Sequence, residues 1–365
     1  MPQRIDQVLA GFAEGDAISN EAVILQHVLR GRGVASDIFV DPEHVSSKVR
    51  DRSRSLSELE GTAGDILIHH YSIASPAVDA FVASPSRKVM IYHNITPGHF
   101  YEGYDDGIAR HLHDARGTMR DLLPKMDGIW ADSDFNAQEL RDMGAAQVDV
   151  LPLLFSPSQF DVPSDPAVAA KFAVPMTNIL FVGRLAPNKR IEDLLEAFAW
   201  YHRVLNRQSR LIIVGSERSA WRYFVMLQMY AAELDLQTVY FERYATAAGL
   251  SAYYDQADLF VTCSQHEGYC LPLVEAMHRG VPVIAHRQGG MPEALGGGGM
   301  LVEGPGPREL AALMHRVMTD DTLRDDVLGT QQRRMDAVRT RDAGAEVQAL
   351  LDKLDRQASE PSRPC

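Results

Sequence analysis

Cysteine and long apolar runs are both scarce in this sequence. Its 365 residues include three cysteines, Cys263, Cys270 and Cys365, at spacings that match no metal-binding motif. So few thiols favour a reducing compartment over a disulfide-stabilised secreted protein. No apolar run approaches the ~18 residues of a membrane span, and the first residues lack the layout of a signal peptide. We therefore expect a cytoplasmic protein.

Positive charge is also in deficit. The chain has 36 Lys and Arg residues against 49 Asp and Glu residues, a net charge of −13, and most of the excess lies in the first 160 residues. A chain this acidic is a poor candidate for non-specific binding to nucleic acid. Its acidic half would also be repelled by an anionic membrane surface.

What the sequence does contain is a repeated alternation of short apolar runs and longer segments with helical periodicity. We predict strands at 65–70, 88–94, 128–133, 148–153, 178–183, 210–215, 238–242, 258–264 and 281–286. We predict helices at 19–30, 107–123, 190–204, 219–234, 247–255, 272–279, 307–318 and 342–357. Continuous apolar strands that alternate with helices are typical of parallel sheets buried on both faces.

The alternation occurs in two series, which predicts an α/β protein with two Rossmann-like domains whose parallel sheets face a central cleft. Prolines and serines cluster at 151–166, where the first series ends. We therefore place the first domain at 1–155 and the second at 156–335, and expect a final helix within 336–357 to cross back to the first. The last residues, SEPSRPC, are predicted to be a loose tail.

A basic loop follows the strand predicted at 178–183. It carries Gly183, Arg184 and Lys189 directly before the helix that begins near residue 190. In open parallel sheets, ligands bind beyond the carboxyl ends of the strands. Glycine lets the backbone approach a ligand closely, and two cations at a helix entrance form a site for an anion. Taken alone, such a loop is equally typical of a solvated surface.

In the stretch HEGYCLPLVEAM, at 266–277, two glutamates flank a segment without charged side chains. Glu267 is predicted in the loop after a strand, and Glu275 in the first turn of a helix that begins at Leu271–Pro272. The amides of 268–271 would then lie at the positive end of that helix, where an anion such as a diphosphate binds. Alternatively, Glu275 only complements the helix dipole and Glu267 is a surface residue; for either glutamate alone this simpler interpretation is favoured.

Together these motifs resemble a known family. GRLAPNK (183–189), HEGYCLPLVEAM (266–277) and GVPVIA (280–285) look like the motifs of a retaining glycosyltransferase of family four, which has the GT-B fold. The resemblance covers residues 175–330 nearly end to end, and the combined motifs are highly specific. It is weaker in the first domain, where GDAISN, HYS and YHNITP look like acceptor-side loops of some bacterial members.

The resemblance implies a role for each matching position. The donor's diphosphate would be bound by Gly15, Arg184, Lys189 and Leu271, and its sugar by Gly268, Tyr269 and Cys270. Glu275 would bind the ribose, Glu242 and Arg243 would lie in the nucleobase region, and Asp16 and Asn94 on the acceptor side. His93 and Glu267 would be the catalytic residues, supporting the charge that develops at the anomeric carbon. On its own His93 would be interpreted as a packed histidine, and only its HNITP context favours the catalytic role.

Three departures from the family pattern affect these roles. Arg190 stands where many members have glycine, and the positive charge that it adds should be tolerated. The nucleobase loop has Glu242–Arg243–Tyr244 where glycine is common, which leaves uracil, guanine and adenine open. The first loop has Gly15 but lacks the double glycine of many relatives, so the acceptor-side roles have weaker support from the sequence.

We expect neither a cofactor nor a catalytic metal. Asp132–Ser133–Asp134 imitates a D-x-D metal motif, but it follows a strand and precedes a helix, so Ser133 or Asp134 is better interpreted as a helix cap. The pairs His69–His70 and Cys263/Cys270 likewise lack the spacing of metal ligands.

The resemblance implies a retaining hexosyltransferase with an acceptor-binding first domain and a nucleotide-sugar-binding second domain. It would move a sugar from a UDP- or GDP-linked donor to a hydroxyl of a carbohydrate, lipid-linked or small-molecule acceptor, by a metal-independent same-face mechanism, in bacterial glycan, glycolipid or glycosylated-metabolite synthesis. A nucleotide-sugar isomerase, epimerase or phosphorylase on the same architecture is the alternative. A non-catalytic sugar-nucleotide-binding protein is disfavoured because the predicted site residues are all present together: Arg184, Lys189, Glu267, Glu275 and His93. An NAD oxidoreductase is disfavoured because no G-x-G-x-x-G follows a strand.

The segment 107–125 leaves peripheral attachment to the inner membrane surface open. It carries four basic residues, Arg110, Arg116, Arg120 and Lys125, on a helix with an apolar face. Asp114 and Asp121 lie among them, so we favour ordinary packing within the first domain.

Overall fold

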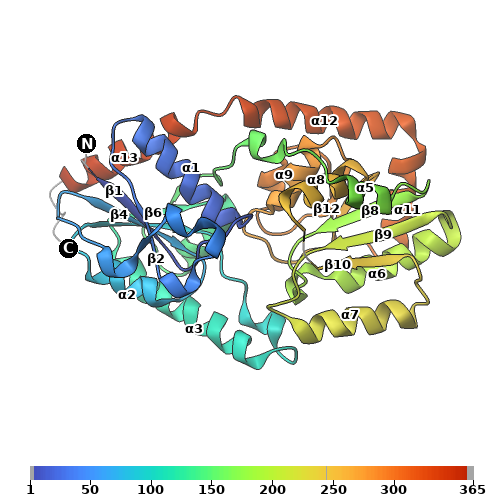
Figure 1. Cartoon of the computed structure of the whole chain (residues 1–365), viewed down its shortest axis with the longest axis horizontal. Coiled ribbons are helices and arrows are strands. Elements are labelled where there is room, and N and C mark those ends of the chain that lie inside the picture. Colours follow the sequence, from blue (N-terminus) through green and yellow to red (C-terminus); the bar gives the residue numbers. More distant parts are fainter. Residues whose placement is uncertain (1–3, 244, 360–365) are drawn as a thin grey trace. The chain divides into compact units, whose positions relative to one another are not determined.

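The chain forms two compact units in a computed structural model that describes residues 4–243 and 245–359. The first unit comprises Met1–Ile95, Arg110–Phe155 and Arg341–Cys365, and the second comprises Thr96–Ala109 and Ser156–Thr340. Tyr244 and the predicted loose tail from residue 360 onward, with Cys365, lie outside the described residues. Each unit is an α/β domain built on a single parallel sheet (Figure 1).

The sheet of the first domain has seven strands in the order β3-β2-β1-β4-β5-β6-β7. These strands are β1 (Ile5–Leu9), β2 (Ile38–Val40), β3 (Arg54–Ser55), β4 (Ile66–Tyr71), β5 (Arg87–Tyr92), β6 (Gly128–Ala131) and β7 (Asp149–Val150). Its helices are α1 (Ala17–Gly31), α2 (Pro76–Ala83), α3 (Asp106–Leu122), which begins in the second unit, α4 (Asp134–Asp142) and α13 (Ala343–Ser359).

Alternate residues of these strands pack on opposite faces of the sheet, because successive side chains of a strand point to opposite faces. One face packs against α1 and the final helix α13; its core residues are Ile5, Leu25, Leu29, Val34, Ile66, Ile68, Val89, Ile91, Trp130, Leu151, Leu154, Val347, Leu351 and Leu354. The other face packs against α2, through Val8, Phe39, Leu67, Ala77 and Phe81. The helix predicted at 342–357 therefore completes the core of the first domain.

The sheet of the second domain has six parallel strands in the order β10-β9-β8-β11-β12-β13. They are β8 (Thr177–Val182), β9 (Ser209–Val214), β10 (Val239–Glu242), β11 (Leu259–Thr262), β12 (Val283–His286) and β13 (Met300–Val302). The helices around them are α5 (Pro166–Lys171), α6 (Ile191–Trp200), α7 (Trp221–Glu233), α8 (Ala247–Asp255), α9 (Leu271–His278), α10 (Met291–Leu295), α11 (Pro307–Thr319) and α12 (Asp321–Arg339).

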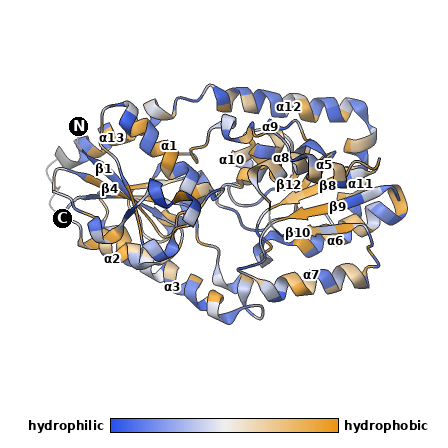
Figure 2. Ribbon diagram, in the orientation of Figure 1, coloured by the Kyte–Doolittle hydropathy of each residue, from blue (hydrophilic) through white to orange (hydrophobic). Residues whose placement is uncertain are grey.

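Hydropathy follows this layering. Figure 2 shows hydrophobic residues gathered on β8 and β9, while hydrophilic residues line much of α12. Within the described residues, no helix combines the length and apolar character that crossing a membrane requires. Two wholly parallel sheets confirm the predicted α/β class with two Rossmann-like domains.

Sequence patterns missed several elements of the fold, among them β1 and α12. β1 was not predicted because Asp6 and Gln7 interrupt its apolar run, yet both side chains are buried. α12 was also missed, since its surface is largely polar. Ser133 does cap α4, as predicted, because its hydroxyl accepts a hydrogen bond from the Asn136 amide.

We expect Leu354→Ala to lower the free energy of unfolding of the first domain by about 2–5 kcal/mol, because the substitution leaves a cavity between α13 and the sheet. Leu354 is 2% exposed. Urea unfolding followed by Trp130 fluorescence measures this, because Trp130 is 1% exposed whereas Trp200 and Trp221 lie at the surface. The exposed Arg356→Ala on the same helix is the control. Equal stabilities for the two variants would contradict the packing of α13.

Candidate donor site at the carboxyl edge of the second sheet

The basic loop is held against the loop that follows β9. The Leu185 amide donates a hydrogen bond to the Ser216 carbonyl at 2.9 Å. Gly215 allows this approach, since a Cβ at that position would lie 1.8 Å from the Gly183 carbonyl oxygen. The Arg184 side chain is exposed and forms no hydrogen bond or ion pair with any other described residue. Its guanidinium is therefore free to bind an anion beyond the end of β8.

Main-chain hydrogen bonds tie this loop to the loop that carries Glu267. The Gln265 amide donates to the Asn188 carbonyl, and the Asn188 side chain donates to the His266 carbonyl, both at 2.9 Å. On the other side, the Gly290 amide donates to the Glu267 carbonyl at 2.9 Å. A Cβ at Gly290 would lie 1.9 Å from the Gly268 carbonyl oxygen, so only glycine fits there.

Lys189 and Glu267 form an ion pair between the two loops. The Lys189 Nζ and Glu267 Oε1 atoms are 2.5 Å apart, and the side chains are 12% and 11% exposed. Ser264 also donates a hydrogen bond to Oε1, at 2.9 Å. Burial by itself would raise the pKa of Glu267, but Lys189 and the hydrogen bonds from Ser264 and Cys270 outweigh it and lower that pKa. Glu267 is thus held as a carboxylate.

Glu275 lies just beyond the first turn of α9, in which it was predicted. It is the fifth residue of α9, beyond the first turn, which contains no acidic residue. The Tyr254 hydroxyl donates to its Oε2 at 2.6 Å, and no described residue donates to Oε1. Burial raises the pKa of Glu275, and the Tyr254 hydrogen bond offsets part of that shift. One oxygen of this carboxylate is therefore left for a ligand hydroxyl.

The residues between the two glutamates offer main-chain groups. Cys270 is the N-cap of α9, in the left-handed region with φ of 76°, and its side chain makes no capping hydrogen bond. The buried Tyr269 side chain points elsewhere, since Arg334 donates to its hydroxyl at 3.3 Å. Leu271 is the first residue of the helix, and its amide lies at the positive end of the helix dipole. These positions suit contact with a ligand through the backbone.

The nucleobase region is already paired within the domain. Lys171 forms an ion pair with Glu242, and the Tyr253 hydroxyl donates to the same carboxylate at 3.0 Å. Arg243 lies 3.4 Å from Glu217 and over the ring of Phe224. A base that binds here would meet this network, and Tyr244 lies outside the described residues.

In the first domain, the predicted residues lie at the carboxyl ends of β1 and β5. Gly15 is exposed with φ of 78°, and Asp16 caps α1 by accepting hydrogen bonds from the Ser19 amide and hydroxyl at 2.9 and 2.7 Å. Asn94 also has a positive φ, 74°, and donates to Asn136 at 2.7 Å. The side chains of Asp16 and Asn94 therefore hold these loops in place through hydrogen bonds.

His93 directly follows β5 and its side chain is 2% exposed. Its Nε2 lies 2.9 Å from His70 Nδ1 and 3.3 Å from Glu21 Oε2, while its Nδ1 lies 3.6 Å from Asp132 Oδ2. Sequence patterns missed Glu21, and placed His70 in an acceptor-side loop without linking it to His93. The available signal was a glutamate among the apolar residues of the helix predicted at 19–30.

Among the described residues, Glu21, His70 and His93 are the one group whose donor atoms are close enough to share a metal ion. The two imidazole rings are nearly coplanar, with an interplanar angle of 4° and centroids 5.2 Å apart. That separation is about the N···N distance plus the two ring radii, so the two nitrogens face each other in the plane of the rings. This orientation suits a shared proton better than a common metal ion.

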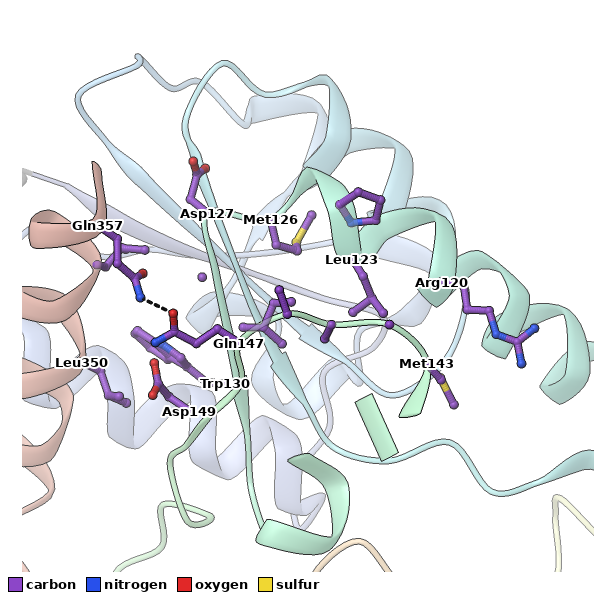
Figure 3. Close-up of a pocket in the computed structure, with 17 residues that line it drawn as sticks. Arg120, Leu123, Met126, Asp127, Trp130, Met143, Gln147, Asp149, Leu350 and Gln357 are labelled. Atoms are coloured by element: carbon purple, nitrogen blue, oxygen red, sulfur yellow. Dashed lines mark hydrogen bonds between the residues drawn. The ribbon is translucent and has the colours of Figure 1, made fainter. Parts of the chain in front are cut away.

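A further pocket lies at the opposite end of the first sheet, where β6 and β7 begin (Figure 3). It has a volume of about 570 Å³ and is lined by residues that include Trp130, Asp149 and Leu350. Gln357 of α13 donates to Gln147 across it at 2.9 Å. Ligands of parallel sheets bind beyond the carboxyl ends of strands, so this pocket is not the candidate site.

The fold is that of GT-B glycosyltransferases. Sucrose-phosphate synthase from Thermosynechococcus elongatus matches with a TM-score of 0.71 and 18% identity, over 98% of this chain and all of that chain. Anabaena Alr3699/HepE, solved in complex with UDP and glucose, matches with a TM-score of 0.71 and 17% identity, over 97% of this chain and all of that one.

Sequence comparison also finds glycosyltransferase relatives, and the match to a family model lies in the second domain. Residues 172–334 match the family model "Glycosyl transferases group 1". D-inositol 3-phosphate glycosyltransferase of Corynebacterium jeikeium is 30% identical over 235 residues, which is 60% of this chain and 55% of that protein. The chain thus spans about half the length of the curated relatives it matches. The matched segment contains both loops of the candidate donor site.

We expect Glu267→Gln to lower the free energy of unfolding at pH 7 by about 1–3 kcal/mol, because Lys189 loses its charged partner. The pKa of Glu267 is lowered in the folded state, so its stabilisation is full above the ordinary glutamate pKa and is lost as pH falls through the folded value. The deficit of the variant should therefore shrink below pH ~4.

Urea unfolding of parent and variant at several pH values measures this deficit. The control is Glu303→Gln, whose side chain is 78% exposed beside Arg287, and which should change little at any pH. A deficit for Glu267→Gln that is the same at acid and neutral pH would contradict the charged pair.

Proposed function

We propose that this protein is a retaining glycosyltransferase that moves a sugar from a UDP- or GDP-linked donor to a hydroxyl of a carbohydrate, lipid-linked or small-molecule acceptor. The observation that carries the proposal is the joined pair of loops in the second domain, with a free Arg184, the Lys189–Glu267 ion pair and the start of α9 at one edge of the sheet. The family match over 172–334 and the UDP-bound fold relatives support it.

The donor's diphosphate would lie at the start of α9, between Arg184 and Lys189. A guanidinium and an ammonium stabilise the two negative charges, and the helix terminus adds a favourable dipole. The carboxylate of Glu275, with one oxygen free of protein donors, would accept hydrogen bonds from the ribose hydroxyls. Glu267 would accept from the sugar, next to the lysine that holds the phosphate.

The reaction would break the bond between the anomeric carbon and the diphosphate oxygen. The acceptor oxygen forms its bond to the same face of that carbon, and the departing phosphate takes the acceptor's proton. Negative charge grows on the phosphate as positive charge grows on the sugar, so fixed cations near one and a carboxylate near the other lower the barrier. Glu267 supports the positive charge and forms no covalent bond, and no step uses a metal ion or cofactor.

We expect Arg184→Ala to weaken nucleoside-diphosphate binding about 10- to 100-fold, since a hydrogen bond to a charged group contributes ~1.5–3 kcal/mol. Glu275→Ala should weaken donor binding by a similar factor. Calorimetry with UDP and GDP, chosen after a thermal-shift panel of nucleotide sugars, measures both variants. Arg316→Ala, an exposed arginine 67% accessible on α11, is the control for loss of positive charge. Unchanged donor turnover in Glu275→Ala would contradict the site.

We also expect EDTA to leave transfer unchanged. The proposed charge stabilisation comes from Arg184, Lys189 and the helix terminus, so no divalent ion is required. Product formation is measured after dialysis against EDTA, with and without added Mg²⁺; loss of activity that Mg²⁺ restores would refute metal independence. Incubation with donor alone separates the alternative function, because an isomerase or epimerase would convert the nucleotide sugar without any acceptor.

A further inference from the structure

The rows of side chains that face α1 in the first sheet change from apolar to polar toward the carboxyl edge. On β4 the row runs Ile66, Ile68, His70, and on β5 it runs Val89, Ile91 and then His93 just past the strand. On β6 it runs from Trp130 to Asp132, whereas on β1 Gln7 lies between the apolar Ile5 and Leu9. The side chains of His70 and Gln7 are fully buried. A buried polar row needs internal hydrogen-bond partners.

Gln7 determines which nitrogen of His70 carries a proton. The Gln7 side-chain amide donates to the Ala22 carbonyl at 3.0 Å, which directs the Gln7 carbonyl oxygen to His70 Nε2 at 2.8 Å. An amide oxygen can only accept, so His70 Nε2 is the donor. Burial lowers the pKa of His70 well below its ordinary value and keeps the ring neutral. His70 Nδ1 therefore carries no proton and can only accept a hydrogen bond.

The unprotonated Nδ1 of His70 determines which nitrogen of His93 carries a proton. His70 Nδ1 and His93 Nε2 are 2.9 Å apart, and a hydrogen bond between them requires His93 to donate. Glu21 lies on the same side, with Oε2 3.3 Å from His93 Nε2 and Oε1 accepting the Leu154 amide at 2.8 Å. Both neighbours thus favour a proton on His93 Nε2.

The charge of His93 depends on the carboxylates that surround it. Burial raises the pKa of Glu21 to about 7. Burial opposes a charge on His93, but the carboxylates of Glu21 and Asp132 outweigh it and raise the pKa of His93. The titratable groups that face His93 are Asp16 and Glu21 from α1 and its cap, His70 from β4, and Asp132 after β6. His69 lies on the other face of the sheet and interacts with His93 only electrostatically.

We propose that Gln7, His70 and Glu21 are positioning residues that hold His93 in the tautomer with its proton on Nε2, directed into the domain, so that Nδ1 is the nitrogen that gains or loses a proton. For catalysis this inference rests on the glycosyl transfer proposed above. His93 then cannot act as a base through Nε2, and its side chain contributes through Nδ1 and through its charge state.

Two substitutions of His70 separate positioning from packing. In His70→Asn the amide oxygen replaces Nδ1, so the acceptor for His93 is kept while the link to Gln7 is lost. In His70→Gln the longer amide replaces Nε2, so the link to Gln7 is kept and His93 loses its acceptor. His69→Asn is the control, because His69 lies on the same strand but faces Tyr71 and Phe81 on the other side of the sheet.

Histidine side-chain ¹H–¹⁵N spectra of the free protein across pH 5–9 read the tautomer directly. We expect His93 of the parent, of His70→Asn and of His69→Asn to carry its proton on Nε2. In His70→Gln we expect a mixture of tautomers, a shifted titration midpoint for His93 and a kcat roughly 10- to 100-fold lower, with a smaller change in KM for the donor.

A parent spectrum with the His93 proton on Nδ1 would overturn the inference, and so would His70→Gln with the tautomer, titration and kcat of the parent. Stoichiometric binding of Zn²⁺ that removes the Nε2 proton signal would show a metal site instead, and would also overturn it. If the parent transfers no sugar, the proposed function fails, while the spectra still decide the tautomer.

Discussion

The ion pair between Lys189 and Glu267 is the constraint on which the candidate donor site depends. Two charges that are nearly out of water are costly unless each has a partner and further hydrogen bonds. Ser264 and Cys270 provide those bonds on the acidic side, and the Asn188 contacts fix the separation of the two loops. The geometry at the end of β8 and β11 follows from satisfying this pair.

The same requirement shapes the first domain in a different way. There the polar groups lie in rows that are otherwise apolar, and each finds its partner on a neighbouring strand or on α1. Parallel strands bring their carboxyl ends to one edge, so residues far apart in the chain meet without any further device. Glu21, 72 positions before His93, reaches it from α1 because Leu154 holds its other oxygen.

Sequence patterns predicted the long apolar strands of both sheets and most of the helices that separate them. They failed at β1, where Gln7 and Asp6 look like breaks in an apolar run, and this failure is informative. A polar residue inside a buried strand is tolerated only when the fold supplies a partner, and Gln7 is part of the network beneath His93. Glu275 was placed in the first turn of α9; the helix does begin at Leu271 as predicted, but Glu275 is its fifth residue and lies just beyond that turn.

The sequence by itself determined the α/β class, the two series of strands and the segments in which Arg184, Lys189, Glu267 and Glu275 lie, because apolar periodicity and turn residues act over short distances. Only the tertiary structure decided which of these groups are paired. It showed that Lys189 is bound to Glu267 while Arg184 is free, and that His93 contacts His70 and Glu21. Protonation and charge pairing depend on burial and on neighbours distant in the chain, which no local pattern records.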